Sequence, residues 1–200
     1  MSKILMTKRK EMPYAVEEAL NRLRINVSFL GNDVRTIMVV SSDENEGKSL
    51  VSMQLWQKLA LSGTTAAFVD MDLRKSVLLD KYGIREETGA KIAGTSYVLS
   101  HDVPFAGSLY ETEVENGYFL PNVDNVINPS ILFSKKRMED FMSFLRKTYP
   151  VTILDCPPLG LVSDGERIAE LCDGAILVVR SGVTSKTFVR QASQQIQRAG

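Results

Sequence analysis

Runs of consecutive apolar residues alternate along this chain with stretches in which apolar residues recur every three or four positions. The runs predict strands, most of them buried on both faces, at residues 36–40, 66–69, 118–120, 151–154 and 175–179. The periodic stretches predict helices at residues 14–30, 49–61, 129–145, 163–171 and 184–199. Strands that alternate with helices in this way predict an α/β fold, with a mostly parallel sheet and helices on both of its faces.

The predicted helices carry an apolar stripe that should face the sheet. We expect Val16 and Leu30 to face inward from the first helix, Ile131 from the helix that follows Pro129, and Phe188 from the last helix. Trp56 lies in the helix at 49–61 and is also expected in the core.

The other segments have weaker patterns. Residues 76–116 contain four glycines among scattered polar residues, which predict short helices and loops. We expect residues 1–13 to form a flexible N-terminal tail. The chain has 200 residues, of which 44% are apolar, and this is enough for one sizeable core. We therefore expect residues 1–200 to form a single domain.

The composition restricts the classes of partner and compartment. The chain has 24 basic and 24 acidic side chains, and its net charge of zero argues against a broad basic surface, so we expect no nucleic-acid partner. His101 is the only histidine, and Cys156 and Cys172 lie outside any CxxC pattern, which argues against a zinc site. The sequence shows neither a signal peptide nor the roughly 18 apolar residues of a membrane span, so we expect a cytoplasmic location.

A polar turn between the strand at 36–40 and the helix at 49–61 carries the first candidate chemistry. Residues 42–49 read SDENEGKS, which matches the phosphate-binding pattern GxxxxGK[ST] except that Ser42 replaces the first glycine. Backbone N–H groups can cradle phosphates there, Lys48 can reach the outer phosphates, and Ser49 can hold Mg²⁺. Asn45 is a residue that tolerates a left-handed backbone. The candidate nucleotide-binding residues are Asp43, Glu44, Asn45, Glu46, Gly47, Lys48, Ser49 and Leu50.

Carboxylates follow two further strands. Asp70 and Asp72 come at the end of the strand at 66–69, and alternation of side chains along an extended segment should place them on the same side. Asp155 follows the strand at 151–154. Aspartate commonly ends strands, but three of them beside a phosphate loop favour a site for Mg²⁺ bridged to phosphates.

These segments resemble the Walker A, Walker A′ and Walker B motifs of the bacterial tyrosine kinases, a family that regulates capsule and exopolysaccharide synthesis. The resemblance rests on the loop at 42–49, on Asp70-Met71-Asp72-Leu73-Arg74, and on Ile153-Leu154-Asp155-Cys156-Pro157-Pro158. Glu18 to Asn26 is similar to the N-terminal helix of the family, and Asn128-Pro129-Ser130 also matches. The resemblance implies a P-loop NTPase-like three-layer sandwich with helices on both faces of the sheet.

The resemblance also implies an ATP-dependent protein-tyrosine kinase, an autokinase that uses ATP and Mg²⁺. Lys48 would neutralise the developing charge, and Ser49, Asp72 and Asp155 would hold Mg²⁺. Asp70 or Asp72 would accept the tyrosine proton, and the sequence alone does not separate these two roles. The implied partners are a membrane adaptor whose cytoplasmic tail activates the kinase, further copies of the chain, and protein tyrosine substrates. The adaptor would recruit the kinase to the inner face of the membrane.

The sequence departs from the family at three places. The N-terminal ExxRxxR pattern of the family, which is linked to ring assembly, reads Glu18, Asn21 and Arg24 here, with one arginine missing. Glu44-Asn45 stands where the family usually has Pro-Gly, which adds a carboxylate near the phosphates. The family usually ends in an autophosphorylated tyrosine cluster, whereas the last tyrosine here is Tyr149, so we expect the tyrosine-rich tail to be absent from these residues.

Two alternative functions share the same loop. A partition or division-site type P-loop ATPase usually has a lysine early in the loop, where this chain has Asp43. A regulator that senses ATP, and controls polysaccharide assembly without phosphorylating a protein, would not need the tyrosine cluster.

Overall fold

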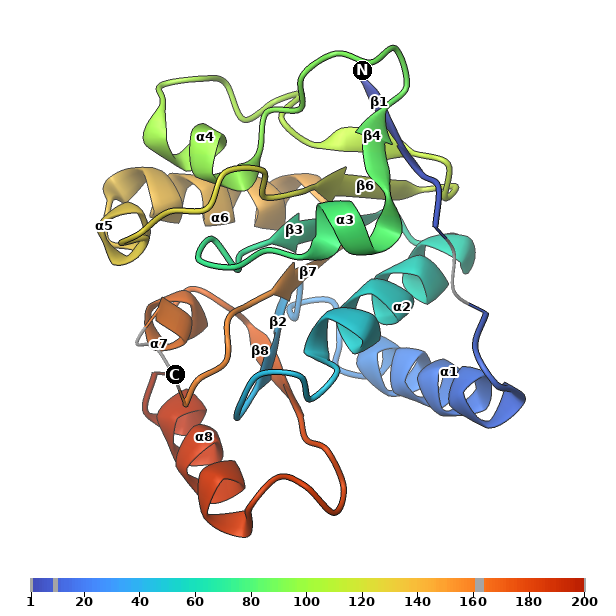
Figure 1. The fold of residues 1–200 in the computed structure, drawn as a ribbon, viewed down its shortest axis with the longest axis vertical. Helices are drawn as coiled ribbons and strands as arrows, with labels where there is room; N and C mark the ends of the chain where they lie inside the picture. The colour runs from blue at the N-terminus through green and yellow to red at the C-terminus, as the bar shows by residue number, and fades with distance from the viewer. Residues whose placement is uncertain (1, 9–10, 161–163, 200) are drawn as a thin grey trace.

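The computed structural model describes residues 2–8, 11–160 and 164–199, and all strands in that part of the chain belong to one sheet (Figure 1). The strands are β1 (Lys3–Met6), β2 (Thr36–Ser41), β3 (Ala66–Asp70), β4 (Ile84–Glu86), β5 (Tyr110–Thr112), β6 (Gly117–Leu120), β7 (Val151–Asp155) and β8 (Gly174–Val178). Their order across the sheet is β4-β1-β5-β6-β3-β7-β2-β8. The five strands from β6 to β8 run parallel, and the antiparallel pairs are β1–β4 and β5–β6.

The helices cover both faces of this sheet. They are α1 (Tyr14–Ser28), α2 (Lys48–Leu61), α3 (Leu78–Tyr82), α4 (Thr95–Ser100), α5 (Ser130–Phe133), α6 (Lys136–Thr148), α7 (Asp164–Ala169) and α8 (Lys186–Ala199). Apolar side chains of α1, α2 and α3 form the core on one face, and those of α4 to α8 form the core on the other. In Figure 1, α1 and α2 lie to the right of β2, and α7 and α8 lie to its left. The predicted α/β architecture is confirmed.

The core beneath α2 is built around aromatic side chains, as predicted for Trp56. The rings of Phe68 and Phe119 stack with their centroids 4.7 Å apart, and Trp56 meets both rings edge-on. Trp56 also donates a hydrogen bond from Nε1 to the carbonyl oxygen of Ala66 at 3.0 Å, so its one polar atom is satisfied inside the core.

The prediction of a flexible tail at residues 1–13 is wrong for residues 3–8. Residues 3–6 form β1, whose Ile4 and Met6 are buried, and Thr7 and Lys8 hydrogen-bond to the backbone of residues 80–83. Met1 and residues 9–10 of the segment lie outside the described residues. A four-residue strand is too short to show a period of its own, and its partners lie about 80 and 110 positions along the chain.

Other differences concern boundaries and helix faces. The segment 76–116 contains the strands β4 and β5 in addition to short helices, and the helix predicted at 129–145 is divided into α5 and α6. Ser163, the expected start of α7, lies outside the described residues. The side chains expected to face inward that are instead exposed are Val16, Leu30, Ile131 and Phe188. In the described part of the chain, no helix combines the length and the apolar character needed to cross a membrane.

Candidate active site

The three predicted motifs meet at one edge of the sheet. β3, β7 and β2 are neighbours and run parallel, so their carboxyl ends lie side by side. The phosphate loop leaves β2, and the register pairs Asp70 of β3 with Asp155 of β7. A pocket of about 560 Å³ opens here, between the phosphate loop on one side and residues of the segment 70–81 on the other.

The phosphate loop has the backbone that its composition predicts. Asn45 has a φ of 61° and Gly47 a φ of 98°, so both positions are left-handed and Asn45 takes the conformation expected of it. Ser42, which replaces the first glycine of the pattern, does not have a positive φ, so this position does not require glycine. α2 begins at Lys48, and the N–H groups of Lys48 and Ser49 have no acceptor within the helix.

The segment that follows β7 contacts the first residue of the phosphate loop. The N–H of Gly160 donates to the carbonyl oxygen of Ser42 at 3.0 Å, and a Cβ on Gly160 would lie only 2.4 Å from that oxygen. Any side chain at position 160 would therefore displace the loop or the segment that follows β7.

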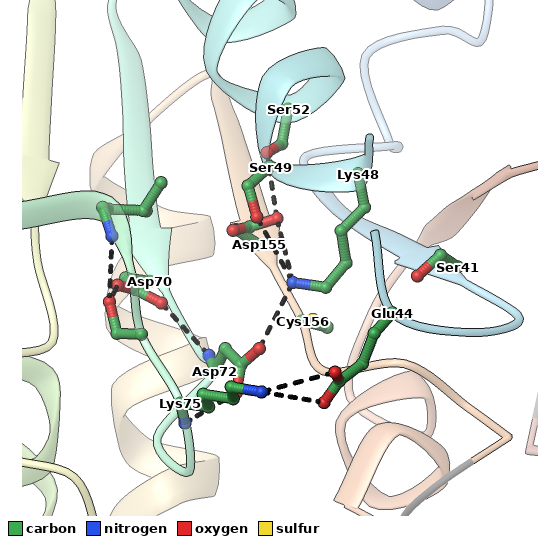
Figure 2. Close-up of polar contacts among 12 residues, drawn as sticks. Ser41, Glu44, Lys48, Ser49, Ser52, Asp70, Asp72, Lys75, Asp155 and Cys156 are labelled. Atoms are coloured by element: carbon green, nitrogen blue, oxygen red, sulfur yellow. Dashed lines mark hydrogen bonds and ion pairs between the residues drawn. The ribbon is translucent and has the colours of Figure 1, made fainter. Parts of the chain in front are cut away.

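Lys48 lies between two carboxylates at the base of the pocket (Figure 2). Its Nζ is 3.3 Å from Oδ2 of Asp72, 3.8 Å from Oδ1 of Asp155 and 3.4 Å from Oγ of Ser49. Burial alone would lower the pKa of Lys48, but the charges of Asp155, Asp72 and Asp70 together raise it above its ordinary value. Lys48 is therefore a fixed positive charge beside the phosphate loop.

Asp155 is held in place by the first turns of α2. Ser52 donates a hydrogen bond to its Oδ1 at 3.0 Å, and the side chain is almost fully buried. Burial raises the pKa of Asp155 above its ordinary value, and the charge of Lys48 and the hydrogen bonds from Ser49 and Ser52 cancel only part of this rise.

Asp70 has different neighbours from Asp72, although the alternation of side chains predicted one shared side. Asp70 accepts hydrogen bonds from the N–H of Asp72 at 3.2 Å, from the N–H of Asn122 at 3.3 Å and from the hydroxyl of Ser76. Its burial first, and the charge of Asp155 second, raise its pKa to about 8, so it is mostly protonated at neutral pH. Asp72, not Asp70, bonds directly to Lys48.

The donor set fits Mg²⁺ better than a metal that is held by protein ligands alone. Among the described residues, no group of three or more His, Cys, Asp or Glu side chains is placed to bind a metal ion. Mg²⁺ usually keeps several waters and takes one or two carboxylates together with phosphate oxygens. The structure offers two such carboxylates, those of Asp72 and Asp155, together with the hydroxyl of Ser49. All three groups lie near Lys48 Nζ.

Most of the predicted nucleotide-binding residues line the pocket, and two do not. The residues that line it are Glu44, Asn45, Gly47, Lys48, Ser49, Leu50, Asp70, Asp72 and Asp155. Asp43 and Glu46 are not among the lining residues, and the carboxylate of Glu46 bonds instead to the N–H groups of Ser42 and Asp43.

The structure adds two ion pairs that sequence reasoning missed. Lys75 bonds to Glu44 at 3.3 Å across the mouth of the pocket, which gives the unusual carboxylate of the loop a partner (Figure 2). Arg74 forms a two-pronged ion pair with the buried Asp164, which also accepts a hydrogen bond from Ser130. The Walker A′-like motif contains Arg74, but no local pattern identifies partners 31 and 90 positions away.

The sequence and the fold of this chain are similar to those of known proteins. No model of a protein family matches it. It is 32% identical over 193 residues to the tyrosine-protein kinase CpsD of Streptococcus pneumoniae serotype 4, and the aligned region covers 96% of this chain and 83% of CpsD.

Solved structures share the fold. The chimerical protein CapA2B2 superposes with a TM-score of 0.83 at 23% identity, over 98% of this chain and 88% of that chain. The septum site-determining protein MinD of Pyrococcus horikoshii OT3, solved as a complex with Mg-ADP, superposes with a TM-score of 0.69 at 25% identity, over 83% of this chain and 66% of MinD. These likenesses confirm the predicted P-loop NTPase-like fold. The identity to CpsD over almost the whole length shows that this chain belongs to the bacterial tyrosine kinases.

Proposed function

We propose that this protein transfers the γ-phosphoryl group of Mg·ATP to tyrosine hydroxyl groups of proteins, itself included, and so regulates the synthesis of a capsular or exopolysaccharide. The observation that carries the proposal is the position of Lys48, with its ammonium group between Asp72 and Asp155 at the base of the pocket beside the phosphate loop. Phosphoryl transfer needs positioned charges more than covalent chemistry, and this arrangement supplies them.

Each charged side chain has a role in this proposal. A new bond forms between the tyrosine oxygen and the γ-phosphorus, and the bond from the γ-phosphorus to the bridging oxygen of ADP breaks. Lys48 neutralises the charge that develops on the transferred oxygens. Asp72 accepts the tyrosine proton. Both Asp72 and Asp70 line the pocket, but Asp70 is mostly protonated at neutral pH. Ser49, Asp72 and Asp155 would hold Mg²⁺, some of them through water, and the ion would supply positive charge to neutralise the phosphates.

The relatives favour a kinase over the two alternatives. The similarity to CpsD covers nearly the whole chain at 32% identity, whereas MinD, a division-site protein, is 25% identical over 83% of the chain. Asp43 also stands where partition and division-site ATPases usually have a lysine.

We further propose the partners that the family resemblance implies: a membrane adaptor whose cytoplasmic tail activates the kinase, and other copies of this chain. The kinase would act in the cytoplasm, where the adaptor would hold it at the inner face of the membrane. Self-association is supported by α1, on which the exposed side chains of Tyr14 and Ile25 share one helical face, with the exposed Phe29 directly after the helix. Exposed apolar side chains on one face of a helix are typical of an interaction surface.

The central test is the substitution Lys48→Met, assayed with labelled ATP and a tyrosine-rich peptide. We expect phosphotyrosine formation to fall by roughly 100-fold or more, because the charge that opposes the transferred phosphoryl group is lost. The substitution Lys91→Met, at an exposed lysine, should retain wild-type activity. Thermal unfolding of both variants establishes that they are folded.

The same assay separates the three functions. A kinase produces phosphotyrosine in proportion to ATP consumed, an ATPase releases free phosphate without phosphotyrosine, and a sensor binds ATP with neither product. Free phosphate alone from the wild-type protein, with its adaptor tail and the peptide present, would refute the kinase. Wild-type turnover by Lys48→Met would refute the assigned site.

A further inference from the structure

The carboxylate of Glu46 connects the start of the phosphate loop to a distant turn. Its Oε2 accepts hydrogen bonds from the N–H of Ser42 at 2.7 Å and from the N–H of Asp43 at 3.1 Å. Its Oε1 accepts a hydrogen bond from the hydroxyl of Thr184, 138 positions further along the chain. One side chain therefore satisfies two donors of the loop and one donor of the segment between β8 and α8.

Thr184 is itself fixed within that segment. Its Oγ accepts a hydrogen bond from the N–H of Arg180 at 2.9 Å, and its own N–H donates to the carbonyl oxygen of Arg180 at 2.9 Å. Because the hydroxyl accepts from Arg180, its single proton is directed to Glu46. A continuous series of hydrogen bonds runs from Arg180 through Thr184 and Glu46 to the first residues of the phosphate loop.

Glu46 is poorly suited to touch the nucleotide. A carboxylate can only accept hydrogen bonds when ionised, and it would repel phosphate oxygens. The side chain does not line the pocket, and the donors that it occupies belong to Ser42 and Asp43, away from the N–H groups of Lys48 and Ser49 at the start of α2.

We propose that Glu46 and Thr184 are positioning residues, which hold the phosphate loop in its nucleotide-binding shape and couple that shape to the turn between β8 and α8. The inference rests on the proposed kinase function, since it assigns how the same site is kept ready for ATP. Charge-assisted hydrogen bonds to backbone N–H groups are among the stronger contacts available to a loop. A loop that is already ordered pays less entropy when it binds phosphate.

The test measures Mg·ADP binding by calorimetry and the steady-state kinetics of peptide phosphorylation. We expect Glu46→Ala and Thr184→Val each to weaken nucleotide binding and to raise KM for ATP by about tenfold, while kcat changes less than twofold. Glu46→Gln should bind nearly as well as the wild type, because the amide can still accept from the loop and donate to Thr184. The double variant should be no weaker than Glu46→Ala, because both changes break the same connection.

Matched controls carry the same chemical change elsewhere. Thr187→Val lies three residues beyond Thr184 at an exposed position of α8, and Glu115→Ala removes another exposed carboxylate. Both should bind Mg·ADP like the wild type. Unfolding curves of all variants show whether a loss of binding reflects a loss of folding. Thr184→Val is nearly isosteric, so it is the variant least expected to disturb folding.

The outcomes separate this inference from the proposed function. Wild-type binding by both Glu46→Ala and Thr184→Val would overturn the inference, and so would a loss in kcat alone with KM unchanged. Either result leaves the kinase proposal intact if Lys48→Met still abolishes phosphotransfer. A wild-type protein that phosphorylates no tyrosine with its adaptor tail present would refute the proposed function, whatever the variants bind.

Discussion

At the scale of single residues, the aspartates of the site have different neighbours and should differ in function. Asp155 faces Lys48 in the pocket, whereas Asp70 is mostly protonated at neutral pH and bonded to three donors around it. We expect Asp155→Asn to raise the Mg²⁺ concentration for half-maximal activity by roughly tenfold or more, because it removes a charge beside the metal. Asp70→Asn should shift this concentration much less, because little charge is lost.

Titration of kinase activity with Mg²⁺ checks this expectation. Asp102→Asn, at a fully exposed aspartate, is the control and should leave the midpoint unchanged. An equal shift for Asp70→Asn and Asp155→Asn would show that Asp70 is ionised in the working site.

The sequence predicted those site residues that lie in a recognisable motif or directly after a predicted strand. Lys48, Asp72 and Asp155 were predictable because each follows a recognisable buried strand, and parallel strands end at one edge of a sheet. The sequence did not predict that the carboxylate of Glu46 bonds to the loop backbone and does not line the pocket, because its hydroxyl partner, Thr184, is far away in the sequence. A one-dimensional pattern indicates which residues are near the site but not the direction in which each side chain points.

At the scale of elements, Asp173 joins the amino ends of β2 and β8 to α6. Its carboxylate accepts hydrogen bonds from the N–H of Arg35, from the N–H and hydroxyl of Thr36, and from Arg146 on α6. Burial alone would raise the pKa of Asp173, but the hydrogen bonds from Arg146 and Thr36 lower it overall, below its ordinary value of 3.8. The ionised form is therefore the one that the fold stabilises.

The sign of this shift fixes the pH dependence. A lowered pKa contributes stability that is fully present above about pH 4 and is lost as the pH falls through the folded-state pKa. We expect Asp173→Asn to lower the free energy of unfolding at pH 7 by roughly 1 kcal/mol, and to reduce the loss of stability on acidification. Urea unfolding between neutral and acid pH measures both effects. Asp33→Asn, at an exposed position, should follow the wild type.

The continuous apolar strands and the longer helices were predictable, whereas most of the short elements were not. The parallel strands β2, β3, β7 and β8 are continuous apolar runs, and α2 has a full helical period, so their positions were predicted to within a few residues. β1, β4 and β5 have three or four residues each, and they are strands because β1 pairs with β4 and β5, and β5 pairs with β6. Phe188 was assigned to the inner face of α8 by its spacing, but half of its surface is exposed.

At the scale of the whole molecule, the proposed adaptor should act on nucleotide affinity. The phosphate loop carries Glu44-Asn45 where the family usually has Pro-Gly, and Glu44 pairs with Lys75 across the mouth of the pocket. We expect the isolated chain to bind ATP weakly, because the carboxylate of Glu44 lies at the mouth of the pocket and repels phosphate oxygens. A partner that stabilises the phosphate-bound position of the Glu44-Asn45 segment should tighten binding by about tenfold.

Calorimetric titration of ATP, with and without the adaptor tail supplied in trans or fused to the chain, measures this effect. A tail of scrambled sequence is the control and should leave the affinity unchanged. Tight binding by the chain alone, unaltered by the tail, would contradict the expectation.

The position of β2 between β7 and β8 governs how the molecule is made. Thr36 pairs with Thr152 and Ile37 with Gly174, so the ribosome delivers β2 more than a hundred residues before either neighbour. During synthesis the backbone N–H and C=O groups on both edges of this apolar strand have no strand to pair with. Strand pairings between residues so far apart in the sequence also form slowly. The nascent chain therefore carries an aggregation-prone strand until β7 and β8 have been synthesised. Asp155 arrives with β7, so the ability to bind nucleotide is acquired only when the centre of the sheet has closed.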